Sequence, residues 1–509
     1  MKIALARRTL VLLASLVWSL FAPESAAQGG YTTEKHPELG LDFKRPRSYE
    51  AVPTQPTDTS TILFFVEKER KRNPKDFRPE LRFLRLEAPE VDPDAPRRTK
   101  VGARPGTFEH YFEQRLKGRW VIVDRQELDG EQGELVFEYT LKLKKGRGAA
   151  WARTFERQQG STVLYGMCDA AEEDDQRKIW RKVADSVEFY EAEAADTSKL
   201  QRYYERRNFS MPEYRIGVRE KLVRGWEADD TENYILVYST RDEALIRILK
   251  SELEAIRKEY VRLFPPAQEV SAISTLRVCK DREEYFKYGG PKTSGGYWNS
   301  AAEELVFFDY ENRDGKMGSG KADSRIVLYH EAFHQYIYYA VGKLAPHSWF
   351  NEGTGDYFSG AKIRGGKVKS IGVNPWRVEY IQQVIEAGRE ESWDDILHYE
   401  QAEFYENRRR GICYAQAWSM IYFLRKSKDV AKHPVWSQIL ERYFETLKTT
   451  YQWESQKLAT KKKVTPVMVE AANKRAREAA VKKAFEGVNL FEIEDAWREY
   501  TLGLKVPKR

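Results

Sequence analysis

In the N-terminal third of the chain, short runs of apolar β-forming residues alternate with polar stretches that contain turn-forming residues. This pattern is typical of strands. It predicts strands at Thr61–Val66, Leu81–Leu86, Trp120–Val123, Glu134–Leu143 and Thr162–Met167. Helical spacing at Phe108–Leu116 and Asp174–Val183, and a last strand around Val187–Tyr190, complete the set. Residues 28–193 are therefore predicted to form a small α+β domain.

The pattern changes beyond this domain. Residues 194–219 are polar and helix-prone, and we expect them to be a linker or a bridging helix. Strands are then predicted at Tyr234–Tyr238, Thr275–Val278 and Glu304–Phe308, with an amphipathic helix at Glu243–Leu263. In the rest of the chain, apolar residues recur at helical spacing between turns that contain glycine or proline. The fold class is therefore α+β, with a second domain over residues 220–509 that ends in an all-helical part.

The first 27 residues have the three parts of a secretory signal peptide. A basic start (Lys2–Arg8) precedes an apolar run (Leu10–Ala22), and the small residues Ser25–Ala27 follow it. Such a segment is removed on export, which predicts a secreted or periplasmic protein. The alternative is a membrane anchor, but the run is shorter than the about 20 residues of a spanning helix. No later stretch is apolar enough, so no transmembrane segment is expected after signal removal.

The composition is that of a globular protein with a charged surface. The chain has 509 residues, of which 41% are hydrophobic and 32% charged, and its formal net charge is +7. Over this length, the excess of positive charge is too small to indicate nucleic-acid binding. Three widely separated cysteines exclude a disulfide framework and a cysteine-rich zinc site, although one bridge is still open to them.

Candidate chemistry begins with two histidines that lie four positions apart in His330-Glu331-Ala-Phe-His334. On a helix, residues four apart share a face, so both imidazoles project from adjacent turns. This arrangement suits two nitrogen ligands of one zinc ion at about 2.0–2.1 Å. Glu331 projects from the same helix, where it can take a proton from a zinc-bound water. The pattern therefore predicts a zinc site.

A third ligand is expected, because catalytic zinc usually has three protein ligands and a water molecule. Glu352 follows in Trp349-Phe-Asn-Glu352-Gly-Thr-Gly-Asp356-Tyr-Phe, a segment of helical character. With the His-Glu-x-x-His run, this segment resembles the gluzincin metallopeptidases, and most closely the bacterial peptidase-MA-like families. The resemblance implies a gluzincin-like domain over residues 220–509, with a short mixed sheet and the two histidines on its active-site helix.

The resemblance also assigns roles. It implies one zinc ion per chain, with His330, His334 and Glu352 as its ligands and Glu331 as the catalytic base. Asp356, one helical turn after Glu352, matches the acidic residue that orients the first histidine. Carboxylates commonly accept the other N–H of a metal-bound imidazole, which agrees with that role.

Gluzincins also use a residue that donates a hydrogen bond to the developing oxyanion. Tyr414, in Tyr414-Ala-Gln-Ala-Trp418, resembles the Tyr-x-x-Gly element of the aminopeptidases, with Ala417 in place of the glycine, and is our candidate. Packing in the core is the alternative for this tyrosine, and His347, His398 and His433 are weaker candidates. The Gly-x-Met-Glu-Asn exopeptidase element of the aminopeptidases is absent from the sequence.

The N-terminal domain resembles the PsbP-like fold in its order of elements, which ends in Leu164-Tyr-Gly166, a helix and Asp185-Ser-Val-Glu-Phe189. The resemblance implies an α/β sandwich-like accessory domain. Together, these features predict an exported zinc metallopeptidase with a peptide or protein substrate and no nucleic-acid partner. The alternative is a non-catalytic binding or scaffold protein of the cell envelope that keeps a gluzincin-like fold. The sequence makes no prediction of oligomeric state.

Overall fold

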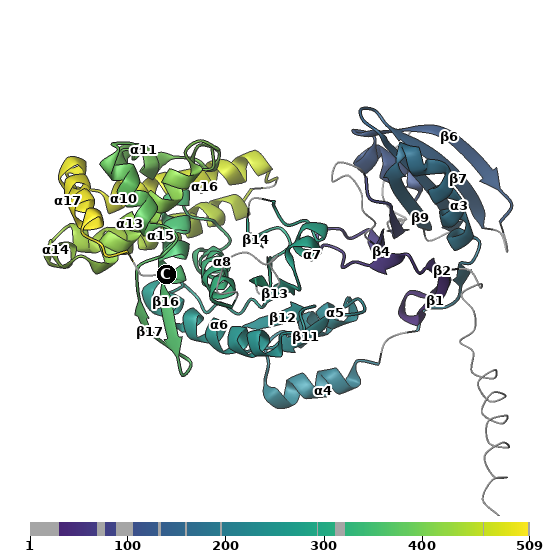
Figure 1. Cartoon of the computed structure of the whole chain (residues 1–509), viewed down its shortest axis with the longest axis horizontal. Coiled ribbons are helices and arrows are strands. Elements are labelled where there is room, and N and C mark those ends of the chain that lie inside the picture. The colour runs from purple at the N-terminus through teal and green to yellow at the C-terminus, as the bar shows by residue number, and fades with distance from the viewer. Residues whose placement is uncertain are drawn as a thin grey trace, which may run out of the picture. The chain divides into compact units, whose positions relative to one another are not determined.

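The computed structural model describes residues 30–68, 77–87, 105–130, 134–157, 160–193, 196–292, 294–310, 321–461 and 463–506. The predicted signal peptide, residues 1–27, lies outside them. The chain divides into two compact units between Asp196 and Thr197, with Gln55–Thr57 grouped with the second unit (Figure 1). Among the described residues, no helix has both the length and the apolar character that crossing a bilayer requires.

The first unit is built on an antiparallel seven-stranded sheet with the order β3-β4-β5-β9-β8-β7-β6 (Figure 1). Its strands are β3 (Tyr49–Ala51), β4 (Thr61–Glu67), β5 (Glu80–Glu87), β6 (Trp120–Leu128), β7 (Leu135–Leu143), β8 (Gly148–Arg157) and β9 (Gly160–Asp169). A smaller sheet joins β1 (Tyr31–His36), β2 (Leu41–Pro46) and β10 (Glu188–Phe189). The sequence did not predict β8, because this strand is buried on both faces and so does not alternate, and Arg153, Thr154 and Glu156 interrupt any apolar run.

Helices cover both faces of the large sheet. On one face, α3 (Glu173–Ala184) places Trp180 directly on Gly166 of β9, where a Cβ atom would lie 2.5 Å from the indole ring. The other face is covered by Phe108 of α2 (Phe108–Tyr111) and by the turn η2 (Phe112–Leu116). The unit is therefore a sheet packed between helices, with one apolar cluster on each face.

The second unit begins with a mixed five-stranded sheet of order β11-β12-β13-β15-β14. Its strands are β11 (Glu227–Asp230), β12 (Tyr234–Tyr238), β13 (Ser274–Cys279), β14 (Gly296–Asn299) and β15 (Glu304–Phe308). The central β12, β13 and β15 are parallel, and the two outer strands are antiparallel to their neighbours. The amphipathic helix α6 (Glu243–Leu263) connects β12 to β13, and α7 (Arg282–Lys287) follows β13. The three strands predicted from the sequence are the three central ones.

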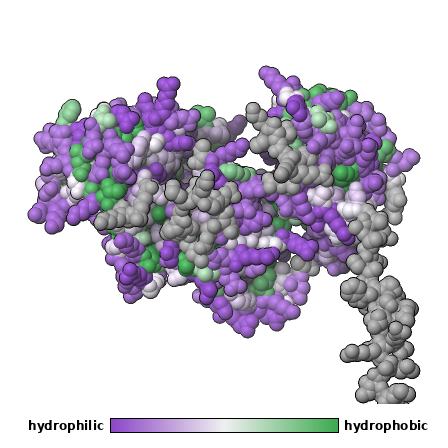
Figure 2. All heavy atoms as spheres, in the orientation of Figure 1, coloured by the Kyte–Doolittle hydropathy of each residue, from purple (hydrophilic) through white to green (hydrophobic). Residues whose placement is uncertain are grey.

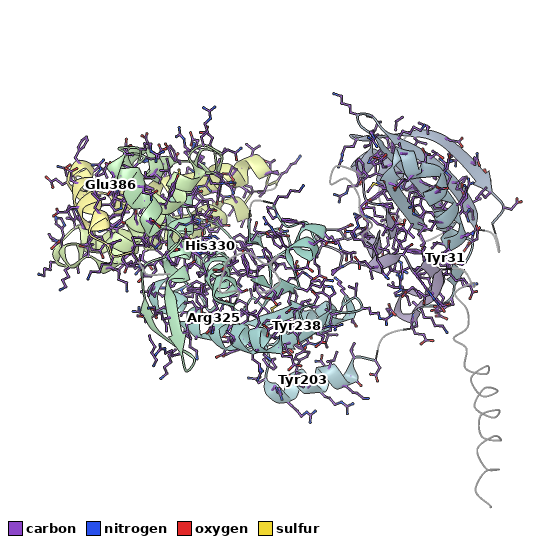
Figure 3. The ribbon with its side chains drawn as sticks, viewed as in Figure 1. Tyr31, Tyr203, Tyr238, Arg325, His330 and Glu386 are labelled. Carbon is purple, nitrogen blue, oxygen red and sulfur yellow. The ribbon has the colours of Figure 1, made fainter. Side chains whose placement is uncertain are left out.

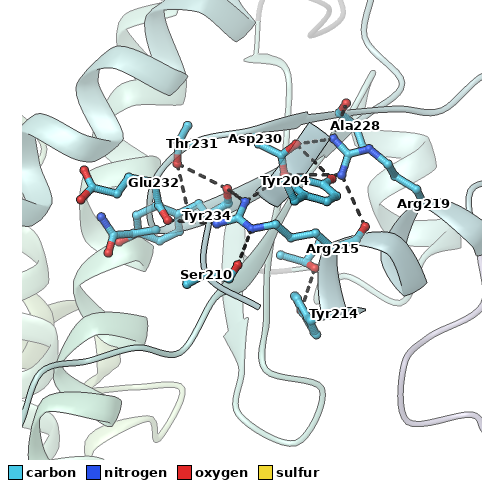
Figure 4. Close-up of polar contacts among 12 residues, drawn as sticks. Tyr204, Ser210, Tyr214, Arg215, Arg219, Ala228, Asp230, Thr231, Glu232 and Tyr234 are labelled. Carbon is cyan, nitrogen blue, oxygen red and sulfur yellow. Dashed lines mark hydrogen bonds and ion pairs between the residues drawn. The ribbon is translucent and has the colours of Figure 1, made fainter. Parts of the chain in front are cut away.

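The segment expected to be a linker, residues 194–219, folds onto this sheet. It contains α4 (Ser198–Arg207) and most of α5 (Pro212–Glu220). Arg215 of α5 is fully buried, and its guanidinium lies 2.8 Å from the carboxylate of Asp230 in β11, to which Arg219 also pairs at 2.6 Å (Figure 4). These ion pairs fix α5 to the edge of the sheet, so the two helices are part of the second unit.

The C-terminal region is helical, as predicted, with one exception. After α8 (Lys321–Val341) and α9 (Ser348–Ser359), the chain forms a hairpin of β16 (Ala361–Arg364) and β17 (Lys367–Ile371). The helices that follow are α10 (Val378–Glu386), α11 (Trp393–His398), α12 (Gln401–Phe404), α13 (Arg410–Lys426), α14 (Lys428–Lys432), α15 (Ile439–Ala459), α16 (Pro466–Ala484) and α17 (Leu490–Leu502). One continuous apolar core joins these helices to the mixed sheet.

Candidate metal centre

Helix α8 runs through the interior of the second unit and carries both histidines of the His-Glu-x-x-His run (Figure 3). Tyr260 of α6 donates a hydrogen bond of 2.6 Å to the backbone carbonyl of Tyr329. Its ring also packs on Phe333, which is fully buried and lies between the two histidines in the sequence. His330 and His334 therefore project from a firmly packed helix, and their ring centroids lie 4.6 Å apart.

Helix α9 brings Glu352 to the same point. The Oε2 atom of Glu352 lies 3.0 Å from Nε2 of His330 and 3.4 Å from Nε2 of His334. The ligand atoms that these three buried residues offer lie within 4.8 Å of one another. Ligands bound at about 2.0–2.1 Å in a tetrahedral site lie about 3.3 Å from one another. The spacing and the chemistry of this donor set therefore fit a zinc ion.

Each histidine has a second polar partner on α9. Nδ1 of His330 lies 3.2 Å from Oδ1 of Asp356, and Nδ1 of His334 lies 2.9 Å from Oδ1 of Asn351. An acceptor at Nδ1 keeps the proton there and leaves Nε2 free to bind a metal. Glu352 lies between these two residues on the helix, so α9 orients both imidazoles and supplies the third ligand.

Asp356 is itself held by residues that follow the hairpin. The Nε atom of Arg377 donates to its Oδ2 atom at 2.6 Å. The side-chain amide of Asn374 donates to the backbone carbonyl of Asp356 at 3.1 Å and contacts its Oδ1 atom at 3.4 Å. The carboxylate therefore has fixed partners on both sides, and its orientation toward His330 is set by the fold.

Two tyrosines lie next to the histidines and Glu352. The hydroxyl of Tyr405 donates to Oε1 of Glu352, so the carboxylate is held on the side away from the histidines. The ring of Tyr414 in α13 is stacked near that of His330, with centroids 6.4 Å apart, and its hydroxyl interacts with Tyr405. The guanidinium of Arg377 lies over the ring of Tyr414, 4.9 Å from its centroid. The sequence-predicted Tyr414 therefore lies beside the candidate centre, together with Tyr405, which the sequence did not single out.

Two glycines of α9 allow the close packing of this region. A Cβ atom on Gly355 would lie 2.9 Å from Nδ1 of His330 and 3.0 Å from its Cε1 atom. A Cβ atom on Gly353 would lie 2.4 Å from the backbone oxygen of Ala417 in α13. Gly355 thus makes room for the imidazole ring, and Gly353 makes room for the backbone of the neighbouring helix.

The electrostatics of the cluster favour a positive charge. Burial by itself lowers the pKa of His330, but hydrogen bonds with Asp356 and Glu352 outweigh this effect, and the pKa lies well above its ordinary value. Burial also lowers the pKa of His334, but the charge of Glu352 and its hydrogen bond outweigh this effect, so the pKa is raised. Burial raises the pKa of Glu352, but the two histidines bring it well below its ordinary value. A metal cation satisfies these buried carboxylates as protonated imidazoles do.

Glu331 lies beside the cluster rather than within it. The backbone N–H of Trp298, on the edge strand β14, donates a hydrogen bond to its carboxylate. Burial raises the pKa of Glu331, more than the neighbouring histidines lower it. A carboxylate with a raised pKa is suited to accept a proton and then to release it.

Asn351, Gly355, Arg377 and Tyr405 are part of this region, although their roles were not predicted from the sequence. Asn351 is adjacent to Glu352 in sequence, and helical spacing would have placed it near His334. Arg377 and Tyr405 carry no such signal, because they lie 21 positions from Asp356 and 53 positions from Glu352. The alternative candidate His347 lies elsewhere: its Nδ1 atom is 3.0 Å from the hydroxyl of Tyr443.

Comparisons with solved structures give distant similarities. The cyanobacterial PsbP protein from Synechocystis sp. PCC 6803 is 15% identical, with a TM-score of 0.24, and the match covers 34% of this chain and 99% of that protein. An aminopeptidase N family protein from Idiomarina loihiensis is 11% identical, with a TM-score of 0.30, and the match covers 88% of this chain and 75% of that protein. At these TM-scores, neither similarity supports an argument about function.

Sequence comparisons point to one region of the chain. No curated protein sequence matches the chain. A family model described as "Protein of unknown function (DUF1570)" matches residues 326–464. The matched region contains both histidines, Glu331, Glu352 and Asp356, and it extends through Tyr405 and Tyr414. The part of the chain that is similar to this family is therefore the part that forms the candidate metal centre.

Proposed function

We propose that the protein is a zinc-dependent metallopeptidase that hydrolyses peptide bonds. The observation that carries the proposal is the convergence of His330, His334 and Glu352, whose ligand atoms lie within 4.8 Å of one another in a buried position. Glu331 lies on the same helix as the two histidines, beside this point. Two imidazoles and one carboxylate are a donor set typical of catalytic zinc, which keeps one further position open.

When held by His330, His334 and Glu352, a zinc ion would act as a Lewis acid that polarises the scissile carbonyl and lowers the pKa of water. Glu331 accepts the proton of the attacking water on a carboxylate oxygen and later delivers it to the leaving amine. Asp356 and Asn351 hold the imidazoles through their Nδ1 atoms, and Tyr405 holds Glu352 through its Oε1 atom. Tyr414 is the candidate donor to the oxyanion, because its ring centroid lies 6.4 Å from that of His330 and its hydroxyl interacts with Tyr405, which itself donates to Glu352.

Export is part of the proposal and is supported by the first 27 residues alone, with their basic, apolar and small-residue segments. The proposed substrate is a peptide or protein outside the cytoplasm. Expression of the full chain with a C-terminal tag tests this point, because cleavage near Ala27 and recovery of the tagged protein outside the cytoplasm are the expected results.

The metal and the chemistry are tested with three single variants of the purified protein. We expect about one zinc per chain in the wild type. Glu352→Ala should lose the metal, whereas Glu331→Gln should keep it and abolish cleavage of a peptide library followed by mass spectrometry. Glu386→Gln, the same chemical change at an exposed position of α10, should alter neither property.

These measurements separate the proposal from its alternative. A wild-type protein that binds no zinc under any loading condition would overturn the metal site and the activity together. Stoichiometric zinc without cleavage of any library peptide would favour the binding or scaffold protein.

A further inference from the structure

The hairpin β16–β17 follows α9 directly and has an uncompensated positive face. Its turn is Gly365-Gly366, and both glycines have positive φ angles (58° and 66°), which a two-residue hairpin turn of this hand requires. Four cationic side chains are exposed on its strands: Lys362, Arg364, Lys367 and Lys369. The hairpin has no acidic residue.

The two faces of the hairpin differ sharply. Ile363 and Val368 are paired across the strands and pack against the apolar core. Arg364 is paired with Lys367, and alternation places Lys362 on the same outward face as Arg364. The apolar face therefore fixes the hairpin to the second unit, and Lys362, Arg364 and Lys367 point outward from it. The register shifts at Lys369, which is exposed but has no partner on the other strand. In the view of Figure 2, the surface in this region is mostly hydrophilic.

This arrangement costs stability within the hairpin. Like charges directly opposite each other on two strands repel. Among the residues that the structure describes, none of the four cations forms an ion pair. Glu252, which lines a cavity of about 340 Å³ between α6 and the hairpin, is already engaged by Tyr329 at 2.6 Å and by Arg325 at 2.9 Å. The face therefore keeps a net positive charge that an acidic ligand can match.

The hairpin is joined to the candidate metal centre at its base. The backbone N–H of Gly372 donates to the carbonyl of Gly360 at 2.9 Å, which closes the base where α9 ends. Two residues further, Asn374 contacts Asp356, the partner of His330. The base of the hairpin is therefore linked through Asn374 and Asp356 to His330 of the candidate metal centre.

We infer that the outward face of the β16–β17 hairpin binds acidic segments of polypeptide and thereby selects the substrates of the neighbouring site. Side chains on one face of a strand repeat every two residues, about 6.6–6.8 Å, which matches alternate side chains of an extended acidic peptide. A bilayer is a poorer partner, because the glycines at the tip offer no apolar side chain for insertion. A nucleic acid is also a poorer partner, because the cationic face holds no aromatic residue on which bases stack.

The substrate class rests on the proposed function, but the binding surface does not, so the test measures binding without turnover. The Glu331→Gln protein is titrated into a fluorescein-labelled peptide of alternating Glu and Ser, and fluorescence anisotropy is followed from about 50 to 500 mM salt. We expect binding that weakens as salt rises. A second variant carries Lys362→Gln, Arg364→Gln, Lys367→Gln and Lys369→Gln in addition, and it should bind the peptide at least about tenfold more weakly.

A matched control removes the same charge elsewhere. Lys428→Gln, Lys432→Gln, Lys461→Gln and Lys482→Gln are all at exposed positions away from the hairpin, and together they should leave binding within about twofold. A Gln–Ser peptide should not bind either protein. Thermal unfolding and zinc content, measured on both quadruple variants, show that the fold and the metal site are intact.

Three results would overturn the inference. The first is equal binding of the acidic peptide by the hairpin variant and its parent, and the second is an equal loss in the control variant. The third comes from binding to vesicles of equal parts phosphatidylglycerol and phosphatidylcholine. If the hairpin variant loses binding to these vesicles but keeps binding to the acidic peptide, the hairpin is a membrane-binding surface instead. None of these results depends on cleavage, so the proposed peptidase activity can fail or succeed independently.

Discussion

Gly355→Ala is a sharp test of the candidate metal centre, because it changes the space around one ligand without removing any polar group. The new Cβ atom would lie 2.9 Å from Nδ1 of His330 and 3.0 Å from Cε1. Ordinary carbon contacts are about 3.5–4.0 Å, so the ring has to move by roughly 0.6 Å or more. Functional sites tolerate displacements of only about 0.5 Å. We therefore expect zinc affinity to fall by about 10–100-fold, as it does when partners of metal ligands are changed.

The fold should tolerate this substitution better than the metal site does. Alanine favours a helix interior by about 0.8–1.0 kcal/mol over glycine, and overpacking costs about 1–3 kcal/mol. The metal-free variant should therefore be destabilised by no more than about 2 kcal/mol. Competition with a chromophoric chelator gives the zinc affinity, and denaturant unfolding of the metal-free protein gives the stability.

The matched control is Gly217→Ala in α5, where no atom lies within 4 Å of the new Cβ position. It should stabilise the protein by about 0.4–1 kcal/mol and leave zinc binding unchanged. The reasoning is refuted if Gly355→Ala binds zinc within about threefold of the wild type, since His330 would then accommodate the contact without cost to its role.

Further predictions separate the two tyrosines and test the packing around the site. Tyr405→Phe should weaken zinc binding by about 10–100-fold, because Glu352 loses its Oε1 partner, and chelator competition measures this effect. Tyr414→Phe should keep zinc and lower kcat by about 10²–10³-fold with KM little changed, which steady-state kinetics measure. Burial lowers the pKa of His347 to about 3, so stability should fall as pH drops below about 6.5, by about 2 kcal/mol between pH 7.5 and 5, and His347→Asn should remove this dependence in denaturant titrations. Arg215→Met should destabilise the second unit by about 3–5 kcal/mol, because it leaves buried Asp230 with only Arg219 and Tyr204 and removes the donor to the carbonyls of Ser210 and Glu232. Unfolding by urea measures the loss.

Each of these predictions has a result that contradicts it. Equal zinc affinity in Tyr405→Phe would mean that Glu352 is positioned by its helix alone. A large rise in KM for Tyr414→Phe would indicate substrate binding rather than stabilisation of the oxyanion. An unchanged pH profile in His347→Asn would assign acid sensitivity to other groups, and a fully stable Arg215→Met protein would show that apolar packing alone holds α5.

Local periodicity predicted the parts of the structure that depend on neighbours in sequence. The spacing of His330 and His334 places both on one helical face, and short apolar runs predicted the central strands β12, β13 and β15. The strand β8 was missed because it is buried on both faces and so does not alternate, and because Arg153, Thr154 and Glu156 interrupt any apolar run. The hairpin β16–β17 was missed although charged and apolar residues alternate on both sides of its Gly365-Gly366 turn, because helical patterns precede and follow it.

Other features depend on contacts between distant residues, which one sequence does not reveal. In the sequence, Arg215 is one of many charged residues in a polar segment. Only its pairing with Asp230, 15 positions away, makes residues 194–219 part of a core rather than a linker. Tyr405 reaches Glu352 across 53 positions in the same way. The small size of Gly355 is visible in the sequence, but its reason is the ring of His330, which belongs to another helix.

The concentration of polar groups on α9 has a consequence for motion as well as for binding. Asn351, Glu352 and Asp356 belong to one short helix, so a displacement of that helix from α8 breaks all three contacts with the histidines together. The centre is therefore assembled or lost as a unit, and a ligand that bridges α8 and α9 ties the two helices into one cooperative element. Backbone amides of α9 should then exchange with deuterium more slowly in the presence of the metal, whereas those of the first unit should exchange at unchanged rates.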